Sequence, residues 1–306
     1  MALKANKIFL IIIKLAISSA LLYIVLSKTS LEKVLDTLKN MSLTAFIAAI
    51  FIYTFTQLVG TLRWKLLLPA GIRVKKLFSL YMIGAFFNNF LPGIIGGDAV
   101  KGYYLYKATG KGGLIMASIF MDRYIGFLGL ITISIAAFPF GFNYMKGSRA
   151  EWLLPLVVLS FFTVSFLIFG LRIGEKIRLL SEFYTYFHAY RNQKEVVGKA
   201  FILSVLIQFS GIIVVYLLSL GMGQRIPLLA FLIFLPLIIL FTTIPISISG
   251  LGIREGAFVL FFGFIGIKPE IATAISLSWF TAISISSLIG LIEYIKYKKE
   301  KITLEV

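Results

Sequence analysis

The chain contains repeated uncharged runs that are each long enough to cross a lipid bilayer. A spanning helix needs about 20 apolar residues, and runs of that length occur at 41–62, 77–97, 124–145, 152–171, 200–224, 226–253 and 271–292. A further run, 8–26, is interrupted only by Lys14. The mean hydropathy of +0.97 is far above that of soluble domains. These features predict an all-α polytopic membrane protein whose residues 1–306 form a single transmembrane domain.

The composition also excludes several kinds of site. The chain has no cysteine, so disulfides, thiol catalysis and cysteine metal sites are excluded. Its one histidine, His188, does not form a metal site alone, and we expect it to be solvated in a basic loop. The longest polar stretch, 172–199, is too short for a domain core. We therefore expect no metal, no cofactor and no soluble domain.

The charge distribution predicts an orientation in the membrane. The net charge of +17 would suit a nucleic-acid partner, but the positive-inside rule explains it more economically. We therefore expect no nucleic acid, a multi-pass location in the cell membrane, and cytoplasmic N- and C-termini. Basic loops fall on the cytoplasmic side only if the segment 77–111 dips into the membrane and returns as a re-entrant motif.

This arrangement predicts eight crossings, with 8–26 as a retained first helix. The crossings lie at about 8–26, 43–62, 122–142, 152–171, 200–220, 228–244, 252–267 and 271–292. The segment 252–267 has few uncharged residues, so a half-helix or a second hairpin is the alternative there. A cytoplasmic loop at 172–199 and a cytoplasmic tail at 293–306 complete the plan. The loop is amphiphilic, so it lies along the membrane interface or packs as an intracellular loop.

The first unusual motif places polar and helix-breaking residues in an apolar run: Asn88, Asn89, Pro92, Gly93, Gly96, Gly97, Asp98 and Lys101. Proline and glycine free backbone groups that hydrocarbon does not satisfy, so such a segment lines a cavity or is buried in protein. The glycines permit a turn, after which Asp98 begins a second segment as its N-cap. The motif is either a substrate-facing break or a plain helix cap, with the two asparagines bonded to neighbouring helices.

The second motif interrupts a run that is longer than one span needs. It contains Pro245, Gly250 and Gly252 and ends in Arg254 and Glu255. Adjacent residues on a helix do not face each other, so we expect each charge to pair elsewhere. The candidate partners are Asp98 or Asp122 for Arg254, and Lys101 or Arg123 for Glu255. Arg254 either contacts phosphate, which suits its guanidinium, or belongs to a structural ion pair.

The pair Asp122 and Arg123 separates the apolar runs 112–121 and 124–145. It is either a solvated helix start or a third contributor to the same polar site. Two broken segments in the two halves of a membrane chain suggest a transporter plan built from inverted repeats, with substrate bound near the midplane. Pro92 precedes Asp98 by a shorter interval than Pro245 precedes Arg254, so the two halves show no sequence repeat.

These motifs resemble the lysylphosphatidylglycerol synthase transmembrane, or flippase-like, family. The resemblance rests on Asn-x-x-Leu-Pro-Gly-x-x-Gly-Gly-Asp ending at Asp98, on Asp122-Arg123, and on Gly-x-Gly-x-Arg-Glu-Gly around Arg254. It implies a membrane region that moves aminoacylated phosphatidylglycerol between leaflets. Larger relatives attach this region to a soluble synthase, which we expect to be absent here. Some archaeal relatives have been labelled glycosyltransferases that use polyprenyl-phosphate sugars.

We therefore expect a lipid translocator rather than an enzyme, acting on an anionic phospholipid or a polyprenyl-phosphate lipid. Arg254 and Lys101 are expected to bind phosphate, while carboxylates and amides orient those bases or contact an amine or sugar. The substrate-binding candidates are Asn88, Asn89, Asp98, Lys101, Asp122, Arg123, Arg254 and Glu255. The alternatives are a membrane-embedded transferase with a carboxylate base, and a small-solute or ion transporter. The sequence favours no oligomeric state.

Overall fold

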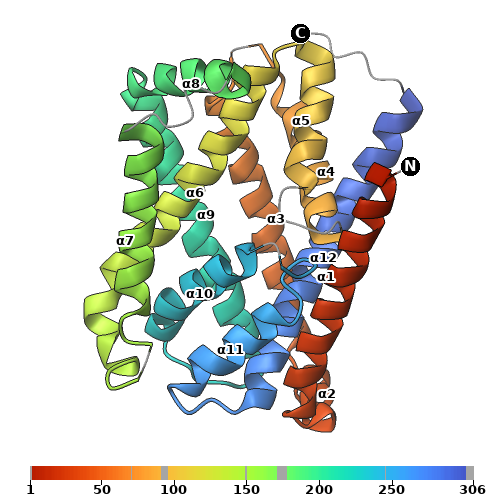
Figure 1. Ribbon diagram of the computed structural model, residues 1–306. Helices are drawn as coiled ribbons and strands as arrows, with labels where there is room; N and C mark the ends of the chain where they lie inside the picture. The colour runs from red at the N-terminus through yellow and green to blue at the C-terminus, as the bar shows by residue number, and fades with distance from the viewer. Residues whose placement is uncertain are drawn as a thin grey trace.

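A computed structural model describes residues 2–69, 71–90, 96–148, 150–170, 178–244 and 246–300, and this part of the chain contains helices and no strand (Figure 1). The helices are α1 (Ala2–Ser27), α2 (Leu31–Lys39), α3 (Leu43–Leu66), α4 (Val74–Phe90), α5 (Gly96–Thr109), α6 (Gly112–Gly141), η1 (Phe142–Tyr144), α7 (Leu153–Ser165), η2 (Phe166–Gly170), α8 (Arg178–Arg191), α9 (Lys194–Gly221), α10 (Leu228–Thr243), α11 (Ile253–Gly263) and α12 (Pro269–Glu300). The all-α membrane fold is confirmed.

Five helical segments in the described residues are long and apolar enough to cross a membrane: Leu43–Leu66, Gly112–Tyr144, Leu153–Gly170, Lys194–Gly221 and Pro269–Tyr297. A sixth is counted if Ile13–Ser27 and Leu31–Lys39, which meet at 88°, form one bent span. The sequence predicted eight crossings. Predicted crossings 228–244 and 252–267 correspond to α10, with 16 residues, and α11, with 11, and the predicted crossing 8–26 is counted only as part of the bent pair.

Helices α4 and α5 form the first hairpin. In Figure 1, α4 runs from the upper end toward the middle of the molecule and α5 returns to the upper end. Gly97 allows this close approach, because a Cβ there would overlap the carbonyl oxygen of Gly84. The predicted hinge residues Pro92 and Gly93 lie outside the described residues. Helices α4 and α5 thus form a hairpin where the charge pattern predicted a re-entrant motif, and its re-entry into the membrane stays a prediction.

Helices α10 and α11 form a second hairpin that points the opposite way. In Figure 1 it rises from the lower end, turns near the middle and descends again. The turn contains three residues with positive φ: Ser249 at 51°, Gly250 at 74° and Gly252 at 82°. The predicted hinge residue Pro245 lies outside the described residues. Because both hairpins return to their own end, α1 begins and α12 ends in the same, upper half of the molecule.

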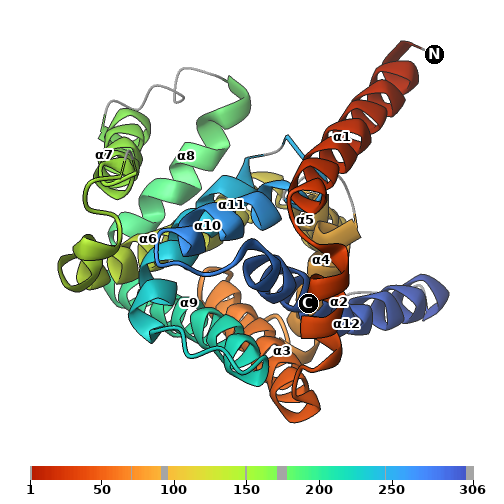
Figure 2. The same ribbon diagram turned by 90° about the horizontal axis from the view of Figure 1, so that it is seen from below.

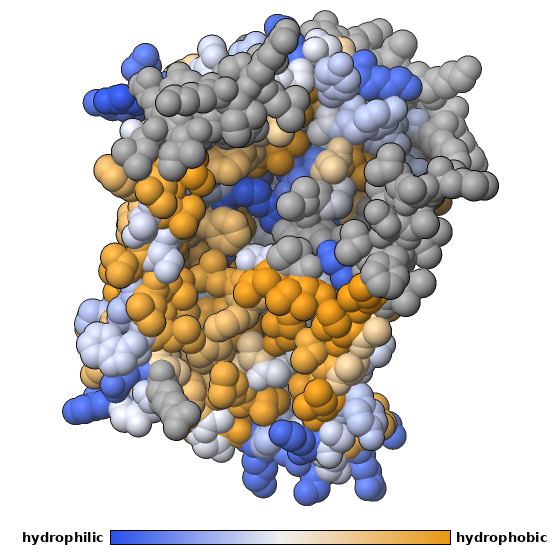
Figure 3. Space-filling model, in the orientation of Figure 1, coloured by the Kyte–Doolittle hydropathy of each residue, from blue (hydrophilic) through white to orange (hydrophobic). Residues whose placement is uncertain are grey.

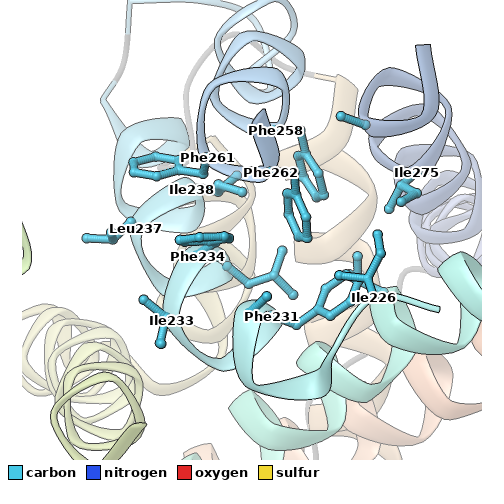
Figure 4. Packing of buried hydrophobic residues seen from close by; sticks show 14 of the residues in the cluster. Ile226, Phe231, Ile233, Phe234, Leu237, Ile238, Phe258, Phe261, Phe262 and Ile275 are labelled. Carbon is cyan, nitrogen blue, oxygen red and sulfur yellow. The ribbon is translucent and has the colours of Figure 1, made fainter. Parts of the chain in front are cut away.

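Aromatic side chains fix the second hairpin. The rings of Phe231 and Phe262 lie 4.9 Å apart, and Phe234 stacks on Phe261 at 5.8 Å (Figure 4). These residues are fully buried. An aromatic pair contributes about 0.5–1.5 kcal/mol beyond the burial of its surface, so this cluster packs α10 against α11.

Helix α7 lies at the edge of the bundle, as the view from below shows (Figure 2). Its link to α6 is aromatic: Phe161 stacks on Tyr124 with ring centroids 5.5 Å apart. Helix α8 crosses the upper end between α7 and α9 (Figure 1). His188, which was expected to be a solvated loop residue, belongs to α8, and its Nε2 atom is buried.

Candidate functional site

The tips of the two hairpins meet beside a central cavity. Its volume is about 340 Å³, and residues of α3, α4, α5, α6, α9, α10, α11 and α12 line it. Ser249, in the second tip, donates a hydrogen bond to the carbonyl of Asn89 at 2.6 Å and lies 3.2 Å from that of Asn88. The cavity therefore lies where the two broken segments come together.

Five charged side chains form one alternating chain along the wall made by α3, α5 and α6. Arg63 Nε lies 2.8 Å from Asp122 Oδ1, and Lys101 Nζ lies 3.7 Å from Asp122 Oδ2. Lys101 is also 2.9 Å from Asp98 Oδ1, whose other oxygen lies 2.6 Å from Arg123 Nε. A charge taken out of water is tolerated only with such partners. Each of these five groups depends on the next.

Lys101 is held most completely. Its ammonium lies 4.7 Å from the ring centroids of both Trp64 and Tyr81, in addition to its two carboxylates. An aromatic face attracts a desolvated cation by about 2 kcal/mol. With 4% of its side chain exposed, Lys101 is positioned to neutralise Asp98 and Asp122 rather than to take up a ligand.

Arg254 and Glu255 form a second, separate charge cluster. The guanidinium Nη2 lies 2.6 Å from Glu255 Oε1, and the Ser276 hydroxyl donates to the same oxygen at 3.0 Å. The prediction that these neighbours pair with other groups was wrong. Glu255 folds back over the first turn of α11 and accepts the backbone N–H of Gly252 at 2.7 Å. This capping geometry brings its carboxylate within reach of Arg254.

Two further expectations about the first motif need correction. Asp98 is the third residue of α5 instead of its N-cap, because the helix begins at Gly96. Its carboxylate binds Lys101 and Arg123. Gly97 is needed for its close approach to α4 rather than for a left-handed turn. Its N–H donates to the side-chain oxygen of Asn88 at 2.8 Å.

Asp122 and Arg123 do not form a solvated helix start. Helix α6 begins at Gly112, and only 2% of Asp122 is exposed. Both residues line the cavity, as do Asn88, Asn89, Asp98, Lys101 and Arg254. Glu255 is fully buried behind Arg254 and does not line it.

Sequence reasoning missed Arg63 as a site residue. It directly follows the uncharged run 41–62, where a basic residue is typical of a cytoplasmic loop. In the structure α3 continues to Leu66, so Arg63 is buried and also donates to Ser204 at 2.8 Å. The available signal was the helix-favouring composition of 63–66, which extends the span. Tyr81 was missed as well, because a tyrosine inside an apolar run carries little information.

Uncharged polar groups complete the lining. Amide and hydroxyl side chains come from Tyr53, Gln57, Tyr81, Asn88, Asn89, Gln208, Thr242, Thr243 and Ser249. The buried Nδ2 of Asn89 has no hydrogen-bond partner among the described residues. Such an atom costs free energy unless water or a ligand accepts its hydrogen bond. The cavity is thus equipped for a polar ligand.

The charge of the lining is positive. Four basic side chains (Arg63, Lys101, Arg123 and Arg254) and two carboxylates (Asp98 and Asp122) face the cavity. Arg123 is the most accessible of the ion-paired groups that line the cavity, with 39% of its side chain exposed. Figure 3 shows a hydrophilic recess in the upper half of one face, above a broad hydrophobic surface. Within the described residues, no group of three His, Cys, Asp or Glu side chains is arranged to hold a metal ion.

Comparisons with known proteins identify the family. The model of the lysylphosphatidylglycerol synthase TM region matches residues 11–290. The chain belongs to this family. It is similar to a UPF0104 membrane protein of Methanocaldococcus jannaschii, with 23% identity over 87% of this chain and 88% of the relative. A UPF0104 membrane protein of Methanothermobacter thermautotrophicus is 25% identical over 70% of this chain and 73% of the relative. No solved structure matches.

In this member of the lysylphosphatidylglycerol synthase TM family, the structure brings three sequence motifs together. The motifs around Asp98, Asp122 and Arg254 are distant in sequence and line the same cavity. Family membership supports a lipid-related role in the membrane.

Proposed function

We propose that the protein translocates a lipid whose headgroup carries a phosphate or another anion. The observation that supports this function is the basic, amide-lined cavity between the tips of two oppositely directed hairpins. Broken helices that meet near the middle of the fold are the usual plan of substrate sites in transporters. The headgroup passes through the cavity while the apolar tails remain in the bilayer.

Two of the three arginines that face the cavity, Arg254 and Arg123, are the phosphate ligands in this proposal. Arg254 uses Nε and Nη2 to bind Glu255 and Ser276, which holds its guanidinium plane against the cavity wall. The Phe280 ring lies 4.5 Å from the guanidinium carbon and limits its movement. Arg123 is oriented by Asp98 and is partly exposed. Lys101, which the sequence suggested as a phosphate ligand, instead sets the charge of the wall.

The lateral hydrophilic recess supports a lipid rather than a small solute as the substrate. The cavity of a small-solute transporter is closed toward the bilayer. The cavity of a lipid transporter opens toward it, because the headgroup lies in a polar environment while the tails remain in the bilayer. The recess in Figure 3 lies next to hydrophobic surface that is suited to acyl chains. Basic residues gather at the upper end, at Lys65, Lys75, Lys76, Lys107 and Lys111. We assign that end to the cytoplasm.

The carboxylates support translocation over group transfer. A general base needs a carboxylate oxygen that is available to accept a proton. Asp98 is bound by Lys101 and Arg123, and Asp122 by Arg63 and Lys101. Glu255 is bound by Arg254 and the N–H of Gly252. Arrangements of this kind hold charges in place and leave no carboxylate of the three ready for catalysis.

The test is lipid scrambling by the protein in vesicles that contain fluorescent phosphatidylglycerol. We expect Arg254→Ala and Asp98→Ala to slow the movement of labelled lipid from the inner to the outer leaflet by at least about tenfold. A tenfold lower rate corresponds to the loss of one hydrogen bond to a charged group. Lys268→Ala removes an exposed basic residue outside the cavity and is the matched control. Wild-type rates in correctly folded Arg254→Ala and Asp98→Ala proteins would overturn the assigned site.

A further inference from the structure

A second cleft lies beneath α8, on the opposite side of α6 from the central cavity. Its volume is about 880 Å³, and α6, α7 with η2, α8 and α9 contribute its walls. Met121 and Leu128 face this cleft, whereas Asp122 and Gly126 face the central cavity. Helix α6 therefore separates two sites, and the second shares no lining residue with the first.

The body of the cleft is aromatic. Phe166, Phe169, Phe187 and Phe201 line it, and the rings of Phe169 and Phe187 stack with centroids 4.3 Å apart. Gly198 lies on the α9 side, and no atom lies within 4 Å of the position a Cβ would take. The cleft is thus apolar and open at Gly198, with room for an extended hydrocarbon chain.

The roof of the cleft is fixed to the bundle. The Tyr190 hydroxyl, in α8, donates a hydrogen bond to the carbonyl of Leu67 at 2.5 Å. Burial raises the pKa of Tyr190 to about 12, so this hydroxyl stays protonated at physiological pH. The described part of α8 is therefore held over the cleft.

The cleft is basic where α8 ends and α9 begins. Arg191 and Lys194 line it, and neither has an ion-pair partner among the described residues. The nearby carboxylate of Glu195 is 2.6 Å from Lys199 and so does not neutralise them. Helix α9 starts at Lys194, and Gln193 makes no side-chain cap. Its first N–H groups and its dipole favour an anion.

His188 adds an independent polar group. Its side chain lines the cleft, and the buried Nε2 atom has no hydrogen-bond partner among the described residues. A buried ring nitrogen without a partner is unfavourable. An amphiphile whose polar part reaches beneath α8 satisfies it.

We propose that this cleft is a binding site for an anionic phospholipid. Its phosphate lies on Arg191, Lys194 and the first turn of α9, and one acyl chain lies among the phenylalanines between α7 and α9. Basic pockets between membrane helices bind anionic lipid headgroups in this way, and the volume is within the range of ligand pockets. The site does not depend on the proposed translocation, because Arg254 and the other charged residues of the central cavity take no part in it.

Native mass spectrometry of the full chain with phosphatidylglycerol tests the proposal. Gly198→Leu fills the cleft, and leucine favours a helix more than glycine does. Gly211→Leu is the matched control, since it is in the same helix, also has open space and lines neither cavity. We expect Gly198→Leu to retain one phosphatidylglycerol fewer than the wild type, and Gly211→Leu to retain the same number. Equal numbers in the two variants would overturn the site.

The charge requirement is tested separately. The double variant Arg191→Gln, Lys194→Gln should weaken phosphatidylglycerol binding about thirtyfold, from two basic residues near an anionic headgroup. Phosphatidylcholine binding should change less than threefold. Equal losses for the two lipids would contradict an anionic ligand. If Arg254→Gln removes the lipid that Gly198→Leu removes, that lipid belongs to the central cavity and the second site is refuted.

Discussion

The two hairpins reach the same cavity and are stabilised in different ways. The α4–α5 hairpin carries Asp98 and Lys101, which belong to a chain of charges shared with α3 and α6. The α10–α11 hairpin carries Arg254 and Glu255, which bind each other and Ser276. It also contains a buried aromatic core, with Phe231 and Phe234 on α10 and Phe261 and Phe262 on α11. The charges of the first hairpin are thus paired with neighbouring helices, whereas the ion pair of the second lies within the hairpin itself.

This difference predicts which hairpin would move during the proposed passage of a headgroup. Apolar cores repack only at a cost, because interiors are close-packed. An ion-pair chain exchanges partners more readily when a charged ligand enters it. We expect the first hairpin to adjust around the ligand and the second to remain a fixed wall.

The largest effect should follow Asp122→Asn. This change leaves Arg63 and Lys101 buried with one carboxylate fewer, and breaking a buried pair costs about 3–5 kcal/mol. Thermal unfolding in detergent or lipid measures it. The exposed Asp36→Asn is the control and should change stability by less than about 0.5 kcal/mol. A loss in Asp122→Asn no larger than in the control would show that the charge chain is not stabilising.

Glu255→Gln should cost less, about 1.5–3 kcal/mol. The single amide oxygen of glutamine replaces only one of the two carboxylate oxygens, so the side chain accepts from Arg254 or from the N–H of Gly252 but not from both, while the aromatic core is untouched. The same unfolding measurement compares it with Asp122→Asn. If Glu255→Gln lowers the stability more than Asp122→Asn does, the aromatic core does not stabilise the second hairpin independently of its ion pair.

Gly97→Ala tests how tightly the first hairpin is closed. The added methyl group would overlap the carbonyl of Gly84, and overpacking of this kind costs about 1–3 kcal/mol. Gly211→Ala is the control, because that position is open and alanine favours the helix by up to about 1 kcal/mol. If Gly97→Ala stabilises the protein as Gly211→Ala does, α4 and α5 can move apart without a loss of folding free energy.

The smallest effect should come from the contact between the tips. Ser249→Ala removes its hydrogen bond to Asn89, worth about 1 kcal/mol. Ser249→Gly loses the same bond but adopts the positive φ of 51° more easily, so it should be less destabilising than alanine. Hydrogen exchange at the two tips reports the change. Faster exchange in the glycine variant than in the alanine variant would contradict the backbone argument.

Much of the site could be predicted from the sequence. Charged and amide side chains inside apolar runs are unfavourable in free energy, so their presence indicates a functional role. The sequence alone identifies Asn88, Asp98, Asp122 and Arg254 by this argument, and all four line the cavity. This argument missed Arg63 because the residue lies at the end of an apolar run, where the positive-inside rule alone favours a loop, and only the helix-favouring composition of 63–66 indicates that α3 continues. The pairing of Arg254 with Glu255 depends on a side chain folding back over a helix start, which spacing rules do not contain.

The fold class followed from hydropathy, but the number of spans did not. The long run at 226–253 and the segment after it contain enough apolar residues for two crossings. In the structure they form one hairpin, because the turn at Ser249 and Gly250 reverses the chain near the middle of the molecule. Hydropathy measures the length of apolar sequence and contains no information on where the chain reverses direction. Charge balance located the first hairpin only because basic residues follow it.

The contact between α4 and α12 has a consequence for biosynthesis. Gly290 lies so close to Met82 that a Cβ would overlap its carbonyl oxygen, and Ser79 donates to Glu293 at 2.7 Å. Ser79 and Glu293 are 214 positions apart in the chain. At roughly 5–20 residues per second, the first hairpin waits about 10–40 seconds for the helix that covers it. During that interval the face of α4 around Ser79 and Met82 lacks its final partner, while Asp98 and Lys101 already have theirs on α6.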